Sequence, residues 1–536
     1  MKENQIRNNG KETLVLAMAL LAFLIPLALI IFIGLTGTGG VFSYPVDDTY
    51  IHMKIAGNLA AYGSWGINPG EFNSASSSIL YTILLSVFFL FFSDPLYVPL
   101  AINITGGIVL ICIIWKWLKE EQISYPYQLI IFLLVIFFTP LPVLVLSGME
   151  HVLQCIFALL FLKTFAAYSS SPERPLKLNL LLFALLLVAT RYEGLFLIVP
   201  AFLYLLYKRQ WTKGFLLLAV AFITIILFGI ISILKGSYFF PNSVLVKSEA
   251  LQFTPGGFIR SAGNIIIEKF TFSKAGITLL ATQRLLLILP LSLLFFRKQL
   301  NLYPTYKMML CLLTAAVFFQ LALADTGKFY RYEAYLVLPS VLVIGLVISK
   351  AYKSFLFSPS LLHRALTFIL IVLLFFPLFL RSSAAFTKAG GAMINIYEQQ
   401  MQMAKFLQAY YPNAGVAAND IGAISYFRNG RIVDLWGLAT LEIAKSKKGN
   451  YWTADFLDSI SVSKNATVAV LFESWIGSSI PSNWTKVATW QIMNNVVSGD
   501  DIVSFYAIDP STAGVLKQNL ENFQNKLPAT VRVAYY

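Results

Sequence analysis

Residues 42–71, FSYPVDDTYIHMKIAGNLAAYGSWGINPGE, form a polar island between long apolar segments of the sequence. The adjacent carboxyl groups of Asp47 and Asp48 follow Pro45, and either aspartate is a suitable N-cap for a helix that starts there. Glycine, asparagine and proline at residues 63–70 then favour turns. The island holds the densest set of reactive side chains in the sequence: Asp47, Asp48, His52, Lys54, Asn58, Asn68 and Glu71.

The predicted helix has one apolar face. Its apolar residues recur at helical spacing, at Ile51, Ile55, Leu59 and Tyr62. We therefore expect the helix to lie on a membrane surface. Asp48 and His52, four positions apart, share a different face.

The composition is that of a multi-pass membrane protein. Of 536 residues, 57% are hydrophobic and only 12% are charged, with a mean hydropathy of +0.71. Soluble domains are less hydrophobic than this and carry about 25% charged residues. The net charge of +14 does not indicate a nucleic-acid partner, because the basic residues form short clusters between apolar runs, as the positive-inside rule predicts. The three cysteines all fall inside apolar runs, so we interpret them as packing residues.

Apolar runs continue as far as residue 380. By the rule of about 20 residues per span, they predict about eleven membrane helices: 12–35, 97–115, 129–146, 152–165, 178–190, 195–207, 215–234, 277–296, 308–324, 334–349 and 365–380. The run 79–92 is short for a span, and whether it crosses decides the parity of every later loop. We prefer that it does not cross, because nearly every basic cluster then lies in a cytoplasmic loop.

This topology places the N-terminus in the cytoplasm and residues 36–78 outside, as the first outer loop. It also brings the polar motifs 147–151 (SGMEH), 191–194 (RYEG) and 325–333 (DTGKFYRYE) to the outer face. Hydropathy falls after residue 383, and strand patterns at 415–418, 431–435, 467–472 and 502–508 alternate with helical ones. We therefore predict an α-helical membrane domain, 1–383, and an extracytoplasmic α/β domain, 384–536, in a bacterial plasma membrane.

Several charged residues suit a catalytic site. One of Asp47 and Asp48 could act as a general base while the other orients it or holds a divalent cation, Mg²⁺ or Mn²⁺, a choice that the sequence leaves open. Lys247, Lys328 and Arg331, with Tyr332, suit a phosphate. Taken singly, such residues are equally explained as helix caps, interface anchors or local ion pairs. The candidate substrate-binding residues are His52, Asn68, Glu71, Glu150, Arg191, Glu193, Asn242 and Asp420.

The sequence has no glycine-rich nucleotide loop, no H-E-x-x-H or G-x-S-x-G motif, and no Cys/His zinc spacing. A soluble nucleotide sugar is therefore not supported as the donor. A phosphate donor on the outer face, where nucleotides are scarce, would most simply be linked to a lipid.

Together the motifs resemble those of GT-C type glycosyltransferases, in particular the mycobacterial terminal arabinofuranosyltransferases and their bacterial relatives. The resemblance runs from residue 47 to residue 438 in the same order as in that group. It rests on 47–51 (DDTYI), 68–71 (NPGE), 147–150 (SGME), 191–194 (RYEG), 241–243 (PNS), 331–332 (RY), 419–423 (NDIGA) and 433–438 (VDLWGL). The sequence departs from the group's pattern at Tyr81, His151 and Tyr192.

The resemblance implies an inverting transferase that moves a sugar from a polyprenyl phosphate to a glycan or lipid acceptor. It implies that an aspartate of the Asp47–Asp48 pair is the base, that Lys247, Lys328 and Arg331 hold the donor phosphate, and that the C-terminal domain helps to receive the acceptor. The alternative is a transporter or flippase of lipid-linked glycans, which predicts charged residues deep in helix centres and an internal repeat. A receptor or scaffold would leave the Asp47 island unexplained.

Overall fold

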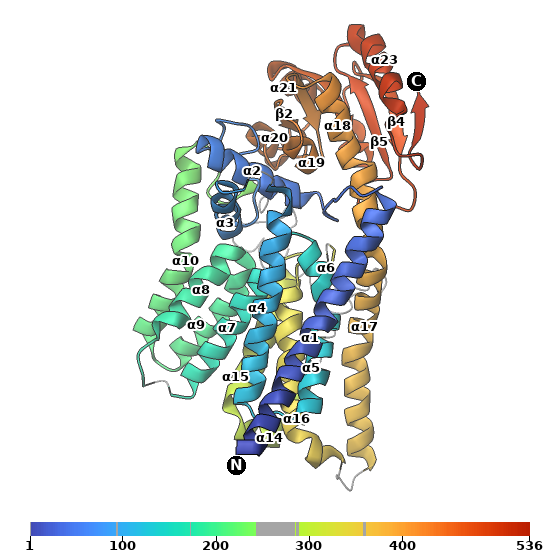
Figure 1. The fold of residues 1–536 in the computed structure, drawn as a ribbon. Helices are drawn as coiled ribbons and strands as arrows, with labels where there is room; N and C mark the ends of the chain where they lie inside the picture. The colour runs from blue at the N-terminus through green and yellow to red at the C-terminus, as the bar shows by residue number, and fades with distance from the viewer. Residues whose placement is uncertain are drawn as a thin grey trace. The chain divides into compact units, whose positions relative to one another are not determined.

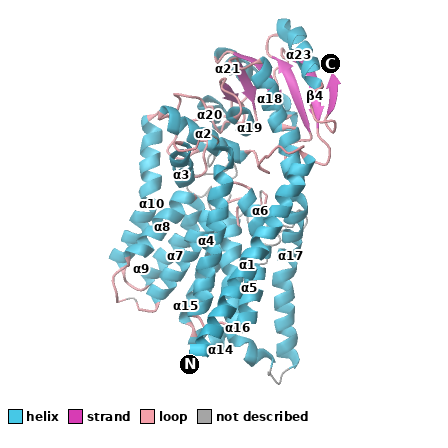
Figure 2. Cartoon of the chain, in the orientation of Figure 1, coloured by secondary structure: helices cyan, strands magenta, loops and turns pink. Residues whose placement is uncertain are grey.

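The computed structural model describes residues 2–92, 95–171, 173–242, 285, 289–327, 329–356 and 361–536. Within these residues the chain is mostly helical, and its strands all belong to the C-terminal part (Figure 2). Figure 1 labels the helices and strands along the chain. The chain folds into two compact units. Unit 1 comprises Met1–Leu29, Leu100–Ile225 and Ala250–Thr387, and unit 2 comprises Ile30–Pro99, Ile226–Glu249 and Lys388–Tyr536.

Unit 1 is built from apolar helices. They are α1 (Lys2–Gly37), α4 (Val98–Glu120), α5 (Tyr125–Phe138), α6 (Leu141–Leu146), α7 (His151–Ser169), α8 (Leu178–Thr190), α9 (Leu195–Tyr207), α10 (Trp211–Leu234), α14 (Arg297–Leu302), α15 (Pro304–Leu323), α16 (Ala334–Leu356) and α17 (Leu361–Glu398). Of these, α1, α4, α10 and α17 have residues in both units. Helix α7 packs against α8, α15 and α16, while α15 also packs against α9.

Five helices in the described part of the chain are long and apolar enough to cross a membrane: Gly10–Gly37, Pro95–Glu120, His151–Ser169, Trp211–Leu234 and Pro304–Leu323. Helices of this kind indicate a membrane protein, in agreement with the composition. The other apolar helices are shorter, so the number of about eleven crossings stays a prediction. The predicted run 277–296 lies largely outside the described residues.

The short helices test the boundaries more finely. The predicted spans 178–190 and 195–207 coincide with α8 and α9. The predicted span 129–146 is instead two helices, α5 and α6, because Pro140 cannot donate the hydrogen bond that would continue the helix. The run 79–92 forms α3 (Ile79–Phe89), whose 11 residues are short for a span.

Unit 2 contains a six-stranded sheet in the order β2-β1-β3-β5-β4-β6. The strands are β1 (Gly415–Ala418), β2 (Ile432–Asp434), β3 (Ala466–Leu471), β4 (Thr485–Gln491), β5 (Ile502–Ala507) and β6 (Arg532–Tyr535). Strand β1 is parallel to β2 and β3, and the remaining pairs are antiparallel. The four predicted strands correspond to β1, β2, β3 and β5, whereas β4 and β6 were not predicted.

Helices cover both faces of this sheet. The helices of unit 2 are α2 (Asp48–Tyr62), α3, α18 (Gln400–Tyr410), α19 (Gly422–Tyr426), α20 (Leu441–Lys448), α21 (Ala454–Ser463), α22 (Glu473–Ile476) and α23 (Ala513–Gln524). Alternate residues of β1 serve the two cores: Val416 packs with α18, α19 and α23, and Ala417 packs with α20 and α21. The domain is therefore a three-layer α/β/α structure.

The predicted helix of the polar island is confirmed as α2; its place on a membrane surface stays a prediction, but the first residues of its apolar stripe contact protein. Ile51 and Ile55 are only 5% and 0% exposed, and they share one core with Ile421 and Ile424 of the C-terminal domain. The first half of the apolar stripe is thus covered by α19, whereas Tyr62 at its far end is 65% exposed. The island belongs to unit 2, together with the sheet, whereas the sequence grouped it with the membrane domain 1–383.

Candidate functional site

The side chain of Asp47 joins the polar island to the sheet domain within unit 2. Asp47 occupies the predicted N-cap position of α2, but its side chain does not cap that helix. Its carboxylate oxygens instead accept hydrogen bonds from the backbone N–H groups of Gly422 (2.5 Å) and Ala423 (2.8 Å), where α19 begins. The first N–H groups of a helix have no partner inside the helix, so a carboxylate is well placed there.

A second carboxyl group, that of Asp420, lies close enough to Asp47 to act on its pKa. The Gln400 side-chain amide also donates to Asp420 Oδ2 over 2.9 Å. Burial, followed by the neighbouring Asp420 carboxyl, raises the pKa of Asp47 well above its usual value. Burial likewise raises the pKa of Asp420, and the charge of Asp48 acts in the same direction. Asp47 and Asp420 therefore form a pair of buried carboxyl groups, each with a raised pKa.

Asp48 differs from Asp47 in its surroundings. It is the first residue of α2 and is half-buried. Both carboxylate oxygens of Asp47 accept hydrogen bonds from α19. The two adjacent aspartates therefore differ: Asp47 holds α19, whereas Asp48 is close enough to act electrostatically on Asp420. Among the described residues, no group of three or more His, Cys, Asp or Glu side chains could hold a metal ion. The described residues therefore provide no set of ligands for the Mg²⁺ or Mn²⁺ ion that the sequence left open.

Two predicted substrate-binding residues, Asn68 and Glu71, contact the edge of the sheet. The Asn68 side chain donates to the Ile432 carbonyl (3.1 Å) and accepts from the Ile432 N–H (3.0 Å), as a neighbouring strand would. It also donates to Glu71 Oε2 over 3.0 Å, and Glu71 forms a salt bridge with Arg431. These contacts occupy both residues in bracing the first loop against edge strand β2.

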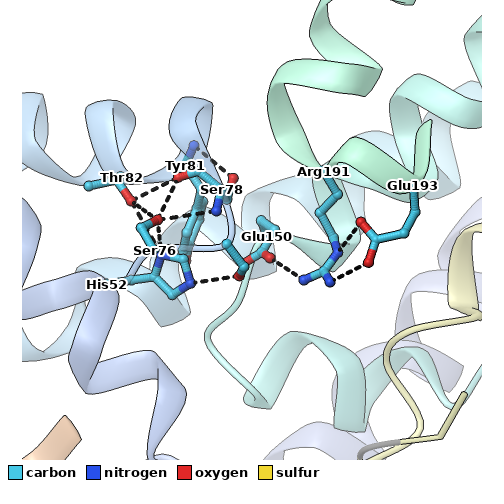
Figure 3. Close-up of polar contacts among 9 residues, drawn as sticks. His52, Ser76, Ser78, Tyr81, Thr82, Glu150, Arg191 and Glu193 are labelled. Carbon is cyan, nitrogen blue, oxygen red and sulfur yellow. Dashed lines mark hydrogen bonds and ion pairs between the residues drawn. The ribbon is translucent and has the colours of Figure 1, made fainter. Parts of the chain in front are cut away.

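His52 lies among hydroxyl groups of the loop that precedes α3 (Figure 3). Its side chain is buried, with Nδ1 3.2 Å from both Ser76 Oγ and Thr82 Oγ1. Its Nε2 is 3.3 Å from Ser77 Oγ, and Ser76 and Thr82 are themselves 2.8 Å apart. This network fixes the imidazole ring relative to α3.

Asn242, another predicted substrate-binding residue, connects three segments of unit 2. Its backbone N–H donates to Ser74 Oγ over 3.1 Å, and its side-chain amide donates to the Leu438 carbonyl over 3.3 Å. Asn242 of the PNS motif thus lies against the first loop and the segment after β2. Ser243 and the residues that follow, including Lys247, lie outside the described residues.

In unit 1, Arg191 forms a buried ion-pair cluster with Glu150 and Glu193 (Figure 3). Its Nη1 is 2.7 Å from Glu150 Oε1, and its Nη2 and Nε are 2.7 and 3.2 Å from the two carboxylate oxygens of Glu193. Arg191 is 6% exposed and Glu150 is fully buried. The predicted trio is therefore brought together, with a bidentate contact that suits a guanidinium.

Tyr332 lies at the centre of a cationic group in the same unit. The guanidinium groups of Arg191 and Arg331 are 5.0 and 5.4 Å from its ring centroid. The His151 ring stacks on it in parallel at 6.0 Å. Arg331 and Tyr332, both predicted to bind the donor phosphate, are thus close to Arg191, whereas Lys328 lies outside the described residues.

The sequence did not predict several of these partners. Glu333 and Arg381 are fully buried and form a salt bridge of 2.9 Å in unit 1. Gln400, the partner of Asp420, carries no motif signal. Arg381 did carry one, since a charge that directly follows an apolar run requires a partner when it is buried.

Comparison with known protein families gives a match within the C-terminal domain. Residues 394–506 match the model of a family described as a domain of unknown function (DUF8728). No curated protein matches the chain. The matched segment contains α18, α19 and β1 to β5, and therefore Asp420 and its partner Gln400.

Proposed function

We propose that this protein is a membrane glycosyltransferase of the GT-C type, which moves a sugar from a polyprenyl phosphate to a glycan or lipid acceptor outside the cytoplasm. The observation that carries the proposal is the group of three carboxyl residues, Asp47, Asp48 and Asp420, in one unit. Carboxyl groups with raised pKa values beside a further carboxylate are typical of sites that move protons near neutral pH. The motif order along the chain supports the same conclusion.

In this proposal Asp48 is the base. An acceptor hydroxyl attacks the anomeric carbon of the donor sugar and gives its proton to the Asp48 carboxylate, while the bond between that carbon and the phosphate oxygen breaks. The electron pair leaves with the polyprenyl phosphate, and the configuration at the anomeric carbon inverts. Asp47 positions α2 through α19, and the raised pKa values of Asp47 and Asp420 favour less negative charge beside the base.

The donor phosphate is assigned to Arg331 and Tyr332, together with Lys247 and Lys328. This assignment rests on the resemblance and on the chemistry of the leaving group, which gains negative charge as the bond breaks. The same proposal includes a location in the bacterial plasma membrane. It places the N-terminus in the cytoplasm and the C-terminal domain outside, because the lipid-linked donor is used on the outer side of the membrane.

A transporter of lipid-linked glycans is the second candidate, and one observation favours it. Arg381 lies well inside α17, fully buried, where a transporter would hold an ionisable group. Its pairing with Glu333 also fits a purely structural role.

The test is transfer by the full-length protein in lipid nanodiscs, with radiolabelled polyprenyl-phosphate sugars or nucleotide sugars as donors and delipidated envelope glycan as acceptor. We expect transfer from a lipid donor only, reduced about 10²- to 10⁴-fold by Asp48→Asn. Asp455→Asn, an exposed aspartate of α21, is the matched control and should retain full activity. Full activity in both Asp47→Asn and Asp48→Asn would reject the proposal. Donor flipping in liposomes without any transfer would favour the transporter.

A further inference from the structure

Three parallel strands of unit 2 end at one edge of the sheet. Strand β2 is followed by Trp436, β1 by Asn419 and Asp420, and β3 by Phe472 and Trp475. In open α/β sheets, ligands bind outside the carboxyl ends of the parallel strands. A ligand is therefore expected at the carboxyl ends of β1, β2 and β3, where Asp420 lies. This edge consists of the strand ends and is distinct from the edge strand β2.

Tryptophan side chains gather at this edge. The ring of Trp436 is 5.1 Å from that of Trp475, and it is 6.5 Å from that of Trp452 with the planes nearly perpendicular. All three residues are half-buried. Half-buried indoles at the end of a sheet differ from the fully enclosed Trp490 of the core, which is 1% exposed.

The last turn of α20 adds positive charge to the same group. It carries Lys445, Lys447 and Lys448. The Lys447 ammonium lies 3.3 Å from the Trp436 ring centroid and 4.4 Å from that of Trp452. Lys448 lies 4.9 Å from the ring centroid of Tyr238. Cations and aromatic faces are thus interleaved across the segments after β2 and α20.

A hydrogen-bonded pair connects the tryptophans to the carboxyl group. The Asn419 side chain donates to the Phe472 carbonyl (2.8 Å) and accepts from the Phe472 N–H (3.0 Å). This pair fixes the end of β1 to the end of β3. Asp420 and Trp475 consequently leave the same edge of the sheet, one residue after Asn419 and three residues after Phe472.

We propose that this edge binds an acidic glycan. Sugar rings pack against the accessible faces of Trp475 and Trp452, because the C–H groups of a sugar are apolar and its hydroxyl groups stay in water. A carboxylate or phosphate substituent on the glycan pairs with Lys447 and Lys448. The proposal deepens the proposed function by naming the acceptor class, and it rests on that function only in treating the bound glycan as the acceptor.

The binding test uses the full-length protein in nanodiscs, titrated with trigalacturonic acid as an acidic probe and galactotriose as a neutral probe, and followed by tryptophan fluorescence and calorimetry. We expect the acidic probe to bind at least tenfold more tightly than the neutral one. Trp475→Ala and Lys448→Gln should each weaken binding of the acidic probe at least tenfold. Trp484→Phe and Lys517→Gln, which lie elsewhere in the domain, serve as controls and should leave binding unchanged.

Three results would overturn the inference: no binding of the acidic probe by the folded wild type, equal binding of both probes, or equal affinity in wild type and variants. A fourth is quenching of Trp475 fluorescence by brominated phosphatidylcholine in the disc, since the indoles would then contact lipid. With a working transfer assay, Trp475→Ala should raise the acceptor KM and leave kcat unchanged. If no donor supports transfer while binding persists, the transferase proposal fails and the glycan site stands.

Discussion

Asp47 and Gly422, 375 residues apart in the chain, are joined by a hydrogen bond of 2.5 Å from the Gly422 backbone N–H to the Asp47 carboxylate. This contact makes the first loop part of the C-terminal domain. The motifs 47–51 and 419–423, far apart in the sequence, each supply one partner of this hydrogen bond.

Substituting Gly422 tests this contact. A Cβ atom at this position would lie 2.1 Å from the Asp47 carbonyl oxygen and 2.4 Å from Asp47 Oδ2, so a side chain cannot fit without moving the loop. We expect Gly422→Ala to lower the free energy of unfolding by about 2–4 kcal/mol, through loss of hydrogen bonds to a charged group. Gly514→Ala is the control, because nothing lies within 4 Å of its Cβ position in α23. Equal thermal stability of the two variants in detergent would refute the contact.

The coupled pair Asp47–Asp420 predicts a dependence of stability on pH. Because the folded pKa of Asp47 is raised above its unfolded value of about 3.9, the folded state holds an extra proton. That stabilisation is complete below about pH 4 and is lost as pH rises through the raised pKa. Replacing Asp420 with Asn removes the neighbouring carboxyl. We therefore expect Asp420→Asn to lose less melting temperature than the wild type between pH 5 and pH 8.5.

The matched variant for this measurement is Asp455→Asn, which should keep the pH profile of the wild type because its exposed side chain lies away from the pair. Identical profiles for wild type and Asp420→Asn would show that the two carboxyl groups are not coupled.

The hydrogen bonds of Asn68 predict that a carboxylate cannot replace its side-chain amide. Its amide both donates to and accepts from the backbone of Ile432. Aspartate cannot donate, and its charge would face the Ile432 carbonyl oxygen. We expect Asn68→Asp to cost about 1–3 kcal/mol of stability, measured by thermal unfolding, whereas Asn522→Asp on the exposed side of α23 should cost little. A stable Asn68→Asp variant with impaired substrate binding would instead support the role predicted from the sequence.

The Arg191 cluster is suited to a double-mutant cycle. Removing the guanidinium in Arg191→Met leaves Glu150 buried without its cation, at a cost of about 3–5 kcal/mol. The double variant Arg191→Met, Glu150→Gln should recover part of that loss, because an amide is cheaper to bury than a carboxylate. Simple additivity of the two single effects in thermal unfolding would contradict a direct pairing.

The sequence predicted the elements well and their partners poorly. Hydropathy located α8 and α9, and strand patterns located β1, β2, β3 and β5, because these signals are local. The contact partner of Ile51 was assigned wrongly, since an apolar stripe on a helix does not reveal whether lipid or protein covers it. Strands β4 and β6 were not predicted; β6 has four residues, all at least partly exposed, so its apolar signal is weak.

The candidate site shows the same limit. The motifs pointed to Asp47, Asp48 and Asp420 as separate residues, but no pattern could show that Asp47 uses its carboxylate on α19 and thereby differs from Asp48. The sequence could not predict that Gln400 and the tryptophans at the strand ends belong to the site, because they come together only when β1, β2 and β3 pair in parallel. The motif 433–438 contains Trp436, but the contact of Trp436 with Trp475 forms between strands that lie 30 or more residues apart in the sequence.

The most direct test of the central claim is the single-turnover rate of sugar transfer in Asp48→Asn, measured alongside the affinity for the lipid-linked donor. If Asp48 takes the proton of the acceptor hydroxyl, the rate should fall about 10²- to 10⁴-fold while donor affinity and melting temperature stay at their wild-type values. A variant that transfers sugar at the wild-type rate, or that loses donor binding and rate together, would contradict the account.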